Sequence, residues 1–298
     1  MAAWAIGAML FHDQPPWPQV RPAVESLCND RSTAVRSAAV KCVLALLNIN
    51  RDEAVRLSLN LAGARAVLGT GEVPNFLYHA QFSHYVALRG LLLEMLQLPD
   101  EKARHTAARQ ITVASFSKAE AKEDLAVVLA GDKSIRKAAA EIFAHNLKFA
   151  SASDTCRTHL IHFFSDSEKD VRQAAAGCFR GLPEEVLTSE AALIGLYIKS
   201  PAFLDGAGQL IWALEKCSVL LPDIVAAIPA KIIERLSIDQ TTDVTRRHHD
   251  TYQVPELVMR LYRQTTDPAT RVRCLDLMDV MLENGFDGLE TELNNVER

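Results

Sequence analysis

The sequence predicts an all-α fold, an α-solenoid of stacked antiparallel helix pairs. A short pattern recurs along the chain: an Asp, then a β-branched residue or Ala directly followed by Arg, then an Ala-rich apolar run. Two successive copies place Arg136 and Arg172 36 residues apart, a period typical of stacked helical repeats. With only 13 Gly and 12 Pro, the chain also lacks the frequent turns of an all-β protein.

Composition sets broad limits on the class of protein. Apolar residues make up 49% of the 298 residues, which is ample for a buried core. The net charge of −5 disfavours a protein that mainly wraps a nucleic-acid backbone. No apolar run is long enough to span a membrane, and the apolar start lacks the basic segment and cleavage site of a signal peptide.

Six cysteines lie in apolar helical stretches, and none forms a C-x-x-C pair. We expect them to be reduced core residues of a cytoplasmic protein. They are Cys28, Cys42, Cys156, Cys178, Cys217 and Cys274.

The first part of the chain, 1–182, predicts regular repeats. Its apolar start has no polar cap, so we expect the chain to be a segment of a longer one. Helical periodicity predicts helices over about 20–30, 35–46 and 51–68. Pro74 is placed to begin a long helix over 75–98, with Phe82 among its inward residues, and Ser117 is a plausible N-cap of the next helix.

After Pro183 the period blurs. We predict irregular helical repeats over 183–253, ending in a loop over 237–253, and a C-terminal repeat with a capping helix over 254–298. Pro255 is expected near the start of a helix. All three parts are expected to form one continuous solenoid.

Asp and Arg recur at a stricter spacing in three repeats, where an Asp precedes the Arg of a Val-Arg pair by six residues. Asp is favoured near a helix start by capping and by the helix dipole, and an Arg one turn inside can reach an Asp of its own or a neighbouring repeat. We therefore expect a structural ladder that ties the repeats together. Its members are Asp30, Arg36, Arg104, Asp132, Arg136, Asp166, Arg172, Asp267 and Arg273.

The pattern L-x-D-x-x-x-x-V-R-x-A-A resembles the HEAT repeat, and its best copy is FFSDSEKDVRQAAAGCF over 163–179. The resemblance implies HEAT-like helix pairs over most of the chain.

A narrower resemblance rests on AGDKSIRKAAAEIFAHNL, FFSDSEKDVRQAAAGCFRGL, SPAF and the stretch from VPELVMRLYRQ to GLETEL. These stretches together look like the C-terminal region of large bacterial NACHT/STAND-type ATPases, often linked to anti-phage defence. That resemblance implies a sensor that binds a trigger while an upstream ATPase drives assembly. This chain has no G-x-x-x-x-G-K-[ST] loop, so no ATPase activity carries over.

No catalytic or cofactor-binding pattern stands out. Gly69-Thr70-Gly71 and Gly206-Ala207-Gly208 are the glycine-rich spots, and neither follows a strand or precedes a phosphate-reaching Lys. The sharpest metal candidates are Cys156, His159 and His162, with Asp166 following at helical spacing. Since histidines beside a helical core are commoner than ligands, we predict no metal and no cofactor.

One dense basic run, Arg246, Arg247, His248 and His249, falls in the predicted loop, and two interpretations are open: it binds a phosphate or an acidic peptide, or it is a solvated connection between helices. A second basic group would form a stripe along one edge of a stacked array, although Asp100, Asp132 and Asp170 would largely cancel its charge. The basic members are Lys102, Arg104, His105, Arg109, Lys133, Arg136 and Lys137.

Three functional hypotheses follow. The first is a non-enzymatic protein-binding scaffold or sensor, whose partner is a protein on the concave surface or an upstream domain of the same chain. The second is a nucleic-acid-binding solenoid that uses the basic loop and the Arg ladder. The third is a zinc enzyme built on His159 and His162.

Overall fold

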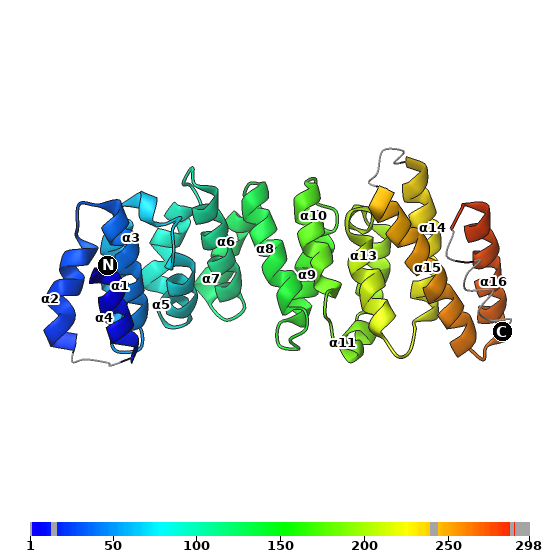
Figure 1. Cartoon of the computed structure of the whole chain (residues 1–298), viewed down its shortest axis with the longest axis horizontal. Coiled ribbons are helices and arrows are strands. Elements are labelled where there is room, and N and C mark those ends of the chain that lie inside the picture. Colours follow the sequence, from blue (N-terminus) through cyan, green and yellow to red (C-terminus); the bar gives the residue numbers. More distant parts are fainter. Residues whose placement is uncertain (1, 13–16, 239–243, 287–288, 290–298) are drawn as a thin grey trace. The chain divides into compact units, whose positions relative to one another are not determined.

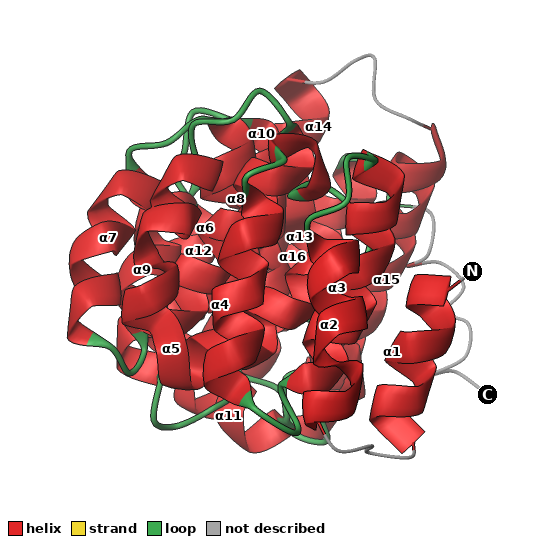
Figure 2. Cartoon of the chain, turned by 90° about the vertical axis from the view of Figure 1, so that its left-hand side faces the viewer, coloured by secondary structure: helices red, strands yellow, loops and turns green. Residues whose placement is uncertain are grey.

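The protein is helical throughout the part of the chain that the computed structural model describes, with sixteen α-helices, two short 3-10 helices and no strand there (Figure 2). The backbone is described for residues 2–12, 17–238, 244–286 and 289, and the side chains for the same residues except 12, 235–238 and 244–252. The predicted all-α solenoid of helix pairs is confirmed.

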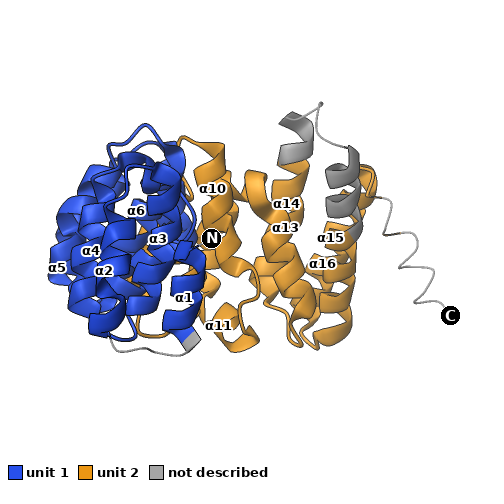
Figure 3. Cartoon of the chain, turned by 60° about the vertical axis from the view of Figure 1, so that its left-hand side comes forward, with its two compact units in different colours: residues 1–142 blue, residues 143–298 orange. Residues whose placement is uncertain are grey.

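The chain divides into two compact units, residues 1–142 and 143–298 (Figure 3), and Figure 1 labels their helices. Unit 1 contains α1 (Ala2–His12), α2 (Trp17–Cys28), α3 (Thr33–Leu46), α4 (Arg51–Ala62), η1 (Arg65–Val67), α5 (Val73–Met95), α6 (Glu101–Ser115) and α7 (Ala119–Leu129). The boundary falls inside α8 (Lys133–Asn146).

Neighbouring helices of unit 1 pack against one another. Helix α3 packs against α1, α2 and α4, while α2 and α4 also contact each other. Helix α6 packs between α5 and α7. The contacting faces are rich in Ala and Val, and Ala39, Ala107 and Ala108 are fully buried. Such small residues let the helix axes approach closely, which stacked repeats require.

Unit 2 contains α9 (Ser153–Phe163), α10 (Lys169–Ala176), η2 (Gly177–Phe179), α11 (Glu184–Ser189), α12 (Ala191–Lys199), α13 (Pro201–Lys216), α14 (Pro222–Ile238), α15 (Val244–Gln264) and α16 (Pro268–Glu283). Here α13 packs against α10, α12 and α15, while α14 lies between α12 and α16. Phe164, Phe179, Tyr197 and Phe203 form an aromatic core in which Phe179 and Tyr197 have ring centroids 4.7 Å apart.

The expected helices exist, but several bounds differ from prediction. Helix α4 ends at Ala62 rather than near Leu68, and η1 follows it. Pro74 lies in the first turn of α5, as predicted. Ser117 is not the N-cap of α7, because that helix is preceded by Lys118. Pro255 lies inside α15 rather than at its start, and most of the predicted capping helix lies outside the described residues.

Candidate functional site

Five arginines share one position and one contact. Each is the fourth residue of its helix, and each guanidinium donates to a backbone carbonyl one to three residues beyond the end of the preceding helix. Carbonyls at a helix end carry partial negative charge, so a cation there is stabilising. The pairs are Arg36 with Asp30 O (2.7 Å), Arg104 with Leu98 O (2.7 Å), Arg136 with Gly131 O (2.7 Å), Arg172 with Asp166 O (2.7 Å) and Arg271 with Thr265 O (3.1 Å).

The aspartates of the pattern cap the same turns in two ways. Asp100, Asp132 and Asp267 directly precede α6, α8 and α16, and each carboxylate accepts from the backbone N–H of the third helical residue. Asp30 and Asp166 lie two residues further from the helix and accept from the backbone N–H of Ser32 and Glu168, at 2.7 and 2.8 Å. The spacing between Asp and Arg is therefore four residues in the first arrangement and six in the second.

Two rungs of the predicted ladder join different helices. Arg104 Nε lies 2.9 Å from Asp132 Oδ2, and Arg172 Nε lies 2.6 Å from Asp205 Oδ2. Arg273 does not pair with Asp267: it lies 2.9 Å from Asp223, and both side chains are exposed. The sequence pattern misplaced this rung because Arg271, not Arg273, is the fourth residue of α16.

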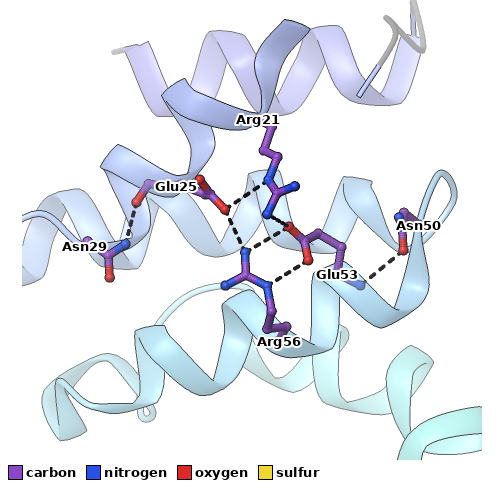
Figure 4. Close-up of polar contacts among 6 residues, drawn as sticks. All are labelled: Arg21, Glu25, Asn29, Asn50, Glu53 and Arg56. Atoms are coloured by element: carbon purple, nitrogen blue, oxygen red, sulfur yellow. Dashed lines mark hydrogen bonds and ion pairs between the residues drawn. The ribbon is translucent and has the colours of Figure 1, made fainter. Parts of the chain in front are cut away.

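Helices α2 and α4 are joined by an ion-pair network that the sequence pattern did not reveal (Figure 4). Arg56 binds Glu25 and Glu53, each at 2.7 Å, and Arg21 lies 3.1 Å from Glu25 and 3.2 Å from Glu53. Hydrogen bonds from Arg56 hold the pKa of Glu53 below its ordinary value. The network joins α2 to α4 and gives each of these four charged side chains partners of opposite charge.

Two buried carboxylates have structural partners. Asp124 accepts from the Tyr85 hydroxyl at 2.8 Å and from two nitrogens of Arg89. Glu190 accepts from Arg157 Nε at 2.8 and 2.9 Å. Each carboxylate joins a pair of helices, and the arrangement offers no pair of free carboxylates for acid–base chemistry.

The metal candidates have other roles. The Cys156 thiol is buried, and burial raises its pKa to about 12, which keeps it protonated. The His159 ring stacks on Phe143 with centroids 4.4 Å apart, and burial lowers the pKa of His159. Nowhere in the described part of the chain do three or more His, Cys, Asp or Glu side chains gather as a metal site would require.

The basic run Arg246, Arg247, His248 and His249 does not lie in a loop. Helix α14 ends at Ile238 and helix α15 begins at Val244, so the predicted loop over 237–253 is wrong for residues 237–238 and 244–253. The polar composition of this stretch suggested a loop. One face of the same helix is nevertheless buried further along, at Val254, Leu257, Val258 and Leu261. The side chains of the basic run lie outside the described residues.

An apolar row lies exposed on α5. Tyr78, Phe82 and Val86 are 44%, 51% and 67% exposed, and the Tyr78 and Phe82 rings contact each other with centroids 5.3 Å apart. The prediction that Phe82 faces inward is wrong: in this turn Leu77, Ala80 and Gln81 are buried instead. We call these three side chains the α5 row.

The family model of the HEAT repeat matches residues 20–49. This range covers most of α2, all of α3 and the turn that Asp30 and Arg36 stabilise. Comparison with curated proteins finds no match. The match supports a HEAT-like repeat over α2 and α3, and the helix pairs of both units support the same kind of repeat architecture. No helix in the described residues has the length and apolar character to cross a membrane.

Proposed function

We propose that the protein is a non-enzymatic protein-binding scaffold or sensor and that the α5 row is its contact surface. The observation that supports this contact surface is the exposure of Tyr78, Phe82 and Val86 along one helix. Single exposed apolar residues are common on soluble proteins, but large neighbouring ones mark interaction sites. HEAT repeats generally mediate protein interactions, which agrees with this assignment.

The surroundings of the α5 row suit an interface. Arg51 donates to Ser83 Oγ at 3.1 Å, and His84 Nε2 lies 2.8 Å from Asp52 Oδ1. An apolar centre with a polar border is the usual anatomy of a protein–protein contact. Aromatic side chains such as Tyr78 and Phe82 also contribute much of the binding energy at such contacts.

The finer proposal is that this chain is the recognition segment of a bacterial STAND-type defence ATPase. It rests on the resemblance of the repeat stretches to the C-terminal regions of those proteins. In that reading the α5 row contacts either a protein trigger or an upstream domain of the same chain.

The nucleic-acid alternative loses its main support. The arginines that would contact phosphates instead donate to helix-end carbonyls, and two of them also pair with Asp132 and Asp205. The remaining support for nucleic-acid binding is the basic run Arg246–His249. Strong salt dependence of nucleic-acid binding would be its signature.

The test is affinity capture from bacterial lysate, with and without nuclease treatment, using three forms of the full chain. Wild type is compared with a Phe82→Glu, Val86→Glu double variant, which adds two negative charges, and with Val219→Glu, which adds one at an exposed valine of unit 2. We expect wild type and Val219→Glu to retain one protein partner and the double variant to lose it.

Circular dichroism and urea midpoints verify that all three forms are folded. A partner that the double variant retains would contradict the α5 row as the contact surface. Recovery of nucleic acid alone, lost on nuclease treatment, would contradict the scaffold assignment.

A further inference from the structure

A cleft of about 610 Å³ lies within unit 1. Its walls come from the loop before α5, from Pro74 in the first turn of α5, from the first two turns of α6 and from the first turn of α8. The lining residues are Gly69, Thr70, Gly71, Pro74, Glu101, Lys102, His105, Thr106 and Ser134. A cleft of this size suits a small ligand.

Two glycines shape the loop wall. A Cβ at Gly69 would lie 2.6 Å from a carboxylate oxygen of Asp100, so only glycine permits this approach to the cap of α6. Gly71 has φ +51°, a backbone conformation that other residues rarely adopt. The Thr70 hydroxyl holds the loop by donating to Val67 O at 2.7 Å. The wall is therefore a defined structural feature.

Two helix N-termini meet at the cleft. Glu101 and Lys102 are the first two residues of α6, and Ser134 is the second residue of α8. The first N–H groups of a helix have no acceptor within the helix, and they carry the positive end of its dipole. The carboxylates of Asp100 and Asp132 already accept from the third N–H group of α6 and α8, so the first two N–H groups of each helix are the ones available to an anion.

Side-chain donors reinforce this preference. Lys102 is exposed at the cleft, and its ammonium has no ion-pair partner in the described part of the chain. His105 lies deeper, with Nε2 3.4 Å from Glu141 Oε2. Glu101 is the one acidic residue of the lining, and the neighbouring Asp100 carboxylate is engaged in capping α6.

A buried hydroxyl provides an independent observation. Ser134 is only 7% exposed, and its Oγ has no hydrogen-bond partner in the structure. Buried hydroxyls in folded proteins are nearly always hydrogen-bonded, so an unpaired one needs an explanation. Because the Oγ atom is itself buried, a ligand oxygen at the base of the cleft would satisfy it after a small shift of the wall.

We propose that this cleft binds the phosphate group of a small organic phosphate ester. A phosphate presents three strong acceptor oxygens and a charge near −2, which matches an ammonium, an imidazole, a hydroxyl and two sets of helix N–H groups. The site is distinct from a nucleotide-hydrolysing loop because it lies between helices and lacks that loop's pattern. The proposal does not rest on the proposed function.

The test titrates inorganic phosphate, a sugar phosphate and a nucleoside monophosphate into the full chain at constant ionic strength, by calorimetry. The variants are Lys102→Ala, Ser134→Ala and the matched control Lys122→Ala, which removes an exposed lysine of α7. We expect saturable binding, at least one ester binding more tightly than inorganic phosphate, and about a tenfold loss of affinity in Lys102→Ala. Lys122→Ala should bind as wild type.

The melting temperature of Ser134→Ala is a second test, because the substitution should affect it in opposite directions without and with ligand. Without ligand its melting temperature should equal or exceed that of wild type, because an unpaired buried hydroxyl is removed. With phosphate its stabilisation should be smaller than that of wild type.

Three outcomes would overturn the proposal: equal affinity of wild type and Lys102→Ala, equal weakening by Lys122→Ala, or no saturable binding of any probe. Inorganic phosphate binding as tightly as both esters would overturn the assignment to an ester.

Discussion

Arg172 and Asp205, 33 residues apart in sequence, form a mostly buried ion pair in which Arg172 Nε lies 2.6 Å from Asp205 Oδ2. The same guanidinium donates from Nη1 to Asp166 O at 2.7 Å and Ser167 O at 2.9 Å. One side chain therefore joins the end of α9, the start of α10 and helix α13. It acts both as a cap and as a rung between repeats.

Arg172→Ala should lower the free energy of unfolding by about 2–3 kcal/mol without abolishing folding, because it leaves a mostly buried carboxylate and two carbonyls without this donor. Urea denaturation monitored by circular dichroism measures the change. Arg273→Ala is the matched control, since Arg273 follows the same Val-Arg pattern but is half-exposed beside an exposed Asp223. It should cost less than about 1 kcal/mol. Equal losses in the two variants would contradict the role assigned to the fourth helical position.

Gly206→Ala should destabilise unit 2 by about 1–3 kcal/mol, because the new Cβ would lie 2.5 Å from Ala176 Cβ where α13 packs on α10. Gly208→Ala, in the same helix, meets nothing within 4 Å and should stabilise by about 0.5–1 kcal/mol. Thermal unfolding of both variants measures the two changes in stability. Two shifts of the same sign would argue against close packing at Gly206.

Glu53 should contribute stability that depends on pH. Its pKa is held below the ordinary value of 4.5 by hydrogen bonds from Arg56, so the folded state favours the charged form. The contribution is present above about pH 4.5 and is lost as the pH falls through the lowered pKa. Because Arg56 is half-exposed, Glu53→Gln should cost only about 1 kcal/mol at pH 7, and the difference from wild type should shrink towards pH 3.

Urea denaturation at several pH values measures this difference. Glu94→Gln is the control, because the pair of Glu94 with Arg65 is largely exposed and should contribute little at any pH. A Glu53→Gln deficit that stays constant down to pH 3 would contradict the assignment.

The cysteine thiols should be unreactive in the folded protein. All six are free and buried, and burial raises the pKa of Cys28 to about 12 and that of Cys42 to about 11. Since the thiolate is the reactive form, a disulfide reagent such as DTNB should label none of them at neutral pH and all six in denaturant. Ala126→Cys, on the exposed face of α7, should add one fast-reacting thiol. A native thiol that reacts as fast would show local opening.

The sequence was sufficient for the helical repeat and for the residues that stabilise its turns. Asp and Arg act through local contacts, over four to six residues, so their spacing is readable along the chain. The reading failed at Arg273, because a spacing of six residues does not reveal where the helix begins. Only the position of Asp267 as the residue before α16 shows that Arg271 is the arginine that caps.

Contacts between repeats were harder to predict from the sequence. Phe82 was expected inward because it is large and apolar, but at 100° per residue it lies about 140° around the helix from the buried Leu77. The cleft beside Lys102 combines residues from three separate segments. Its lining could not be inferred from any one of them, although Gly69 and Lys102 had each been noted separately.

By itself the sequence determined the helices, their small-residue packing faces and the Asp and Arg caps of most repeat turns, because these depend on neighbours a few residues away. Only the tertiary structure decided which arginines also bridge helices, which apolar side chains stay in water and where a cleft opens. Those features depend on which residues about 30 positions apart are brought together, and that is set by how successive helix pairs pack.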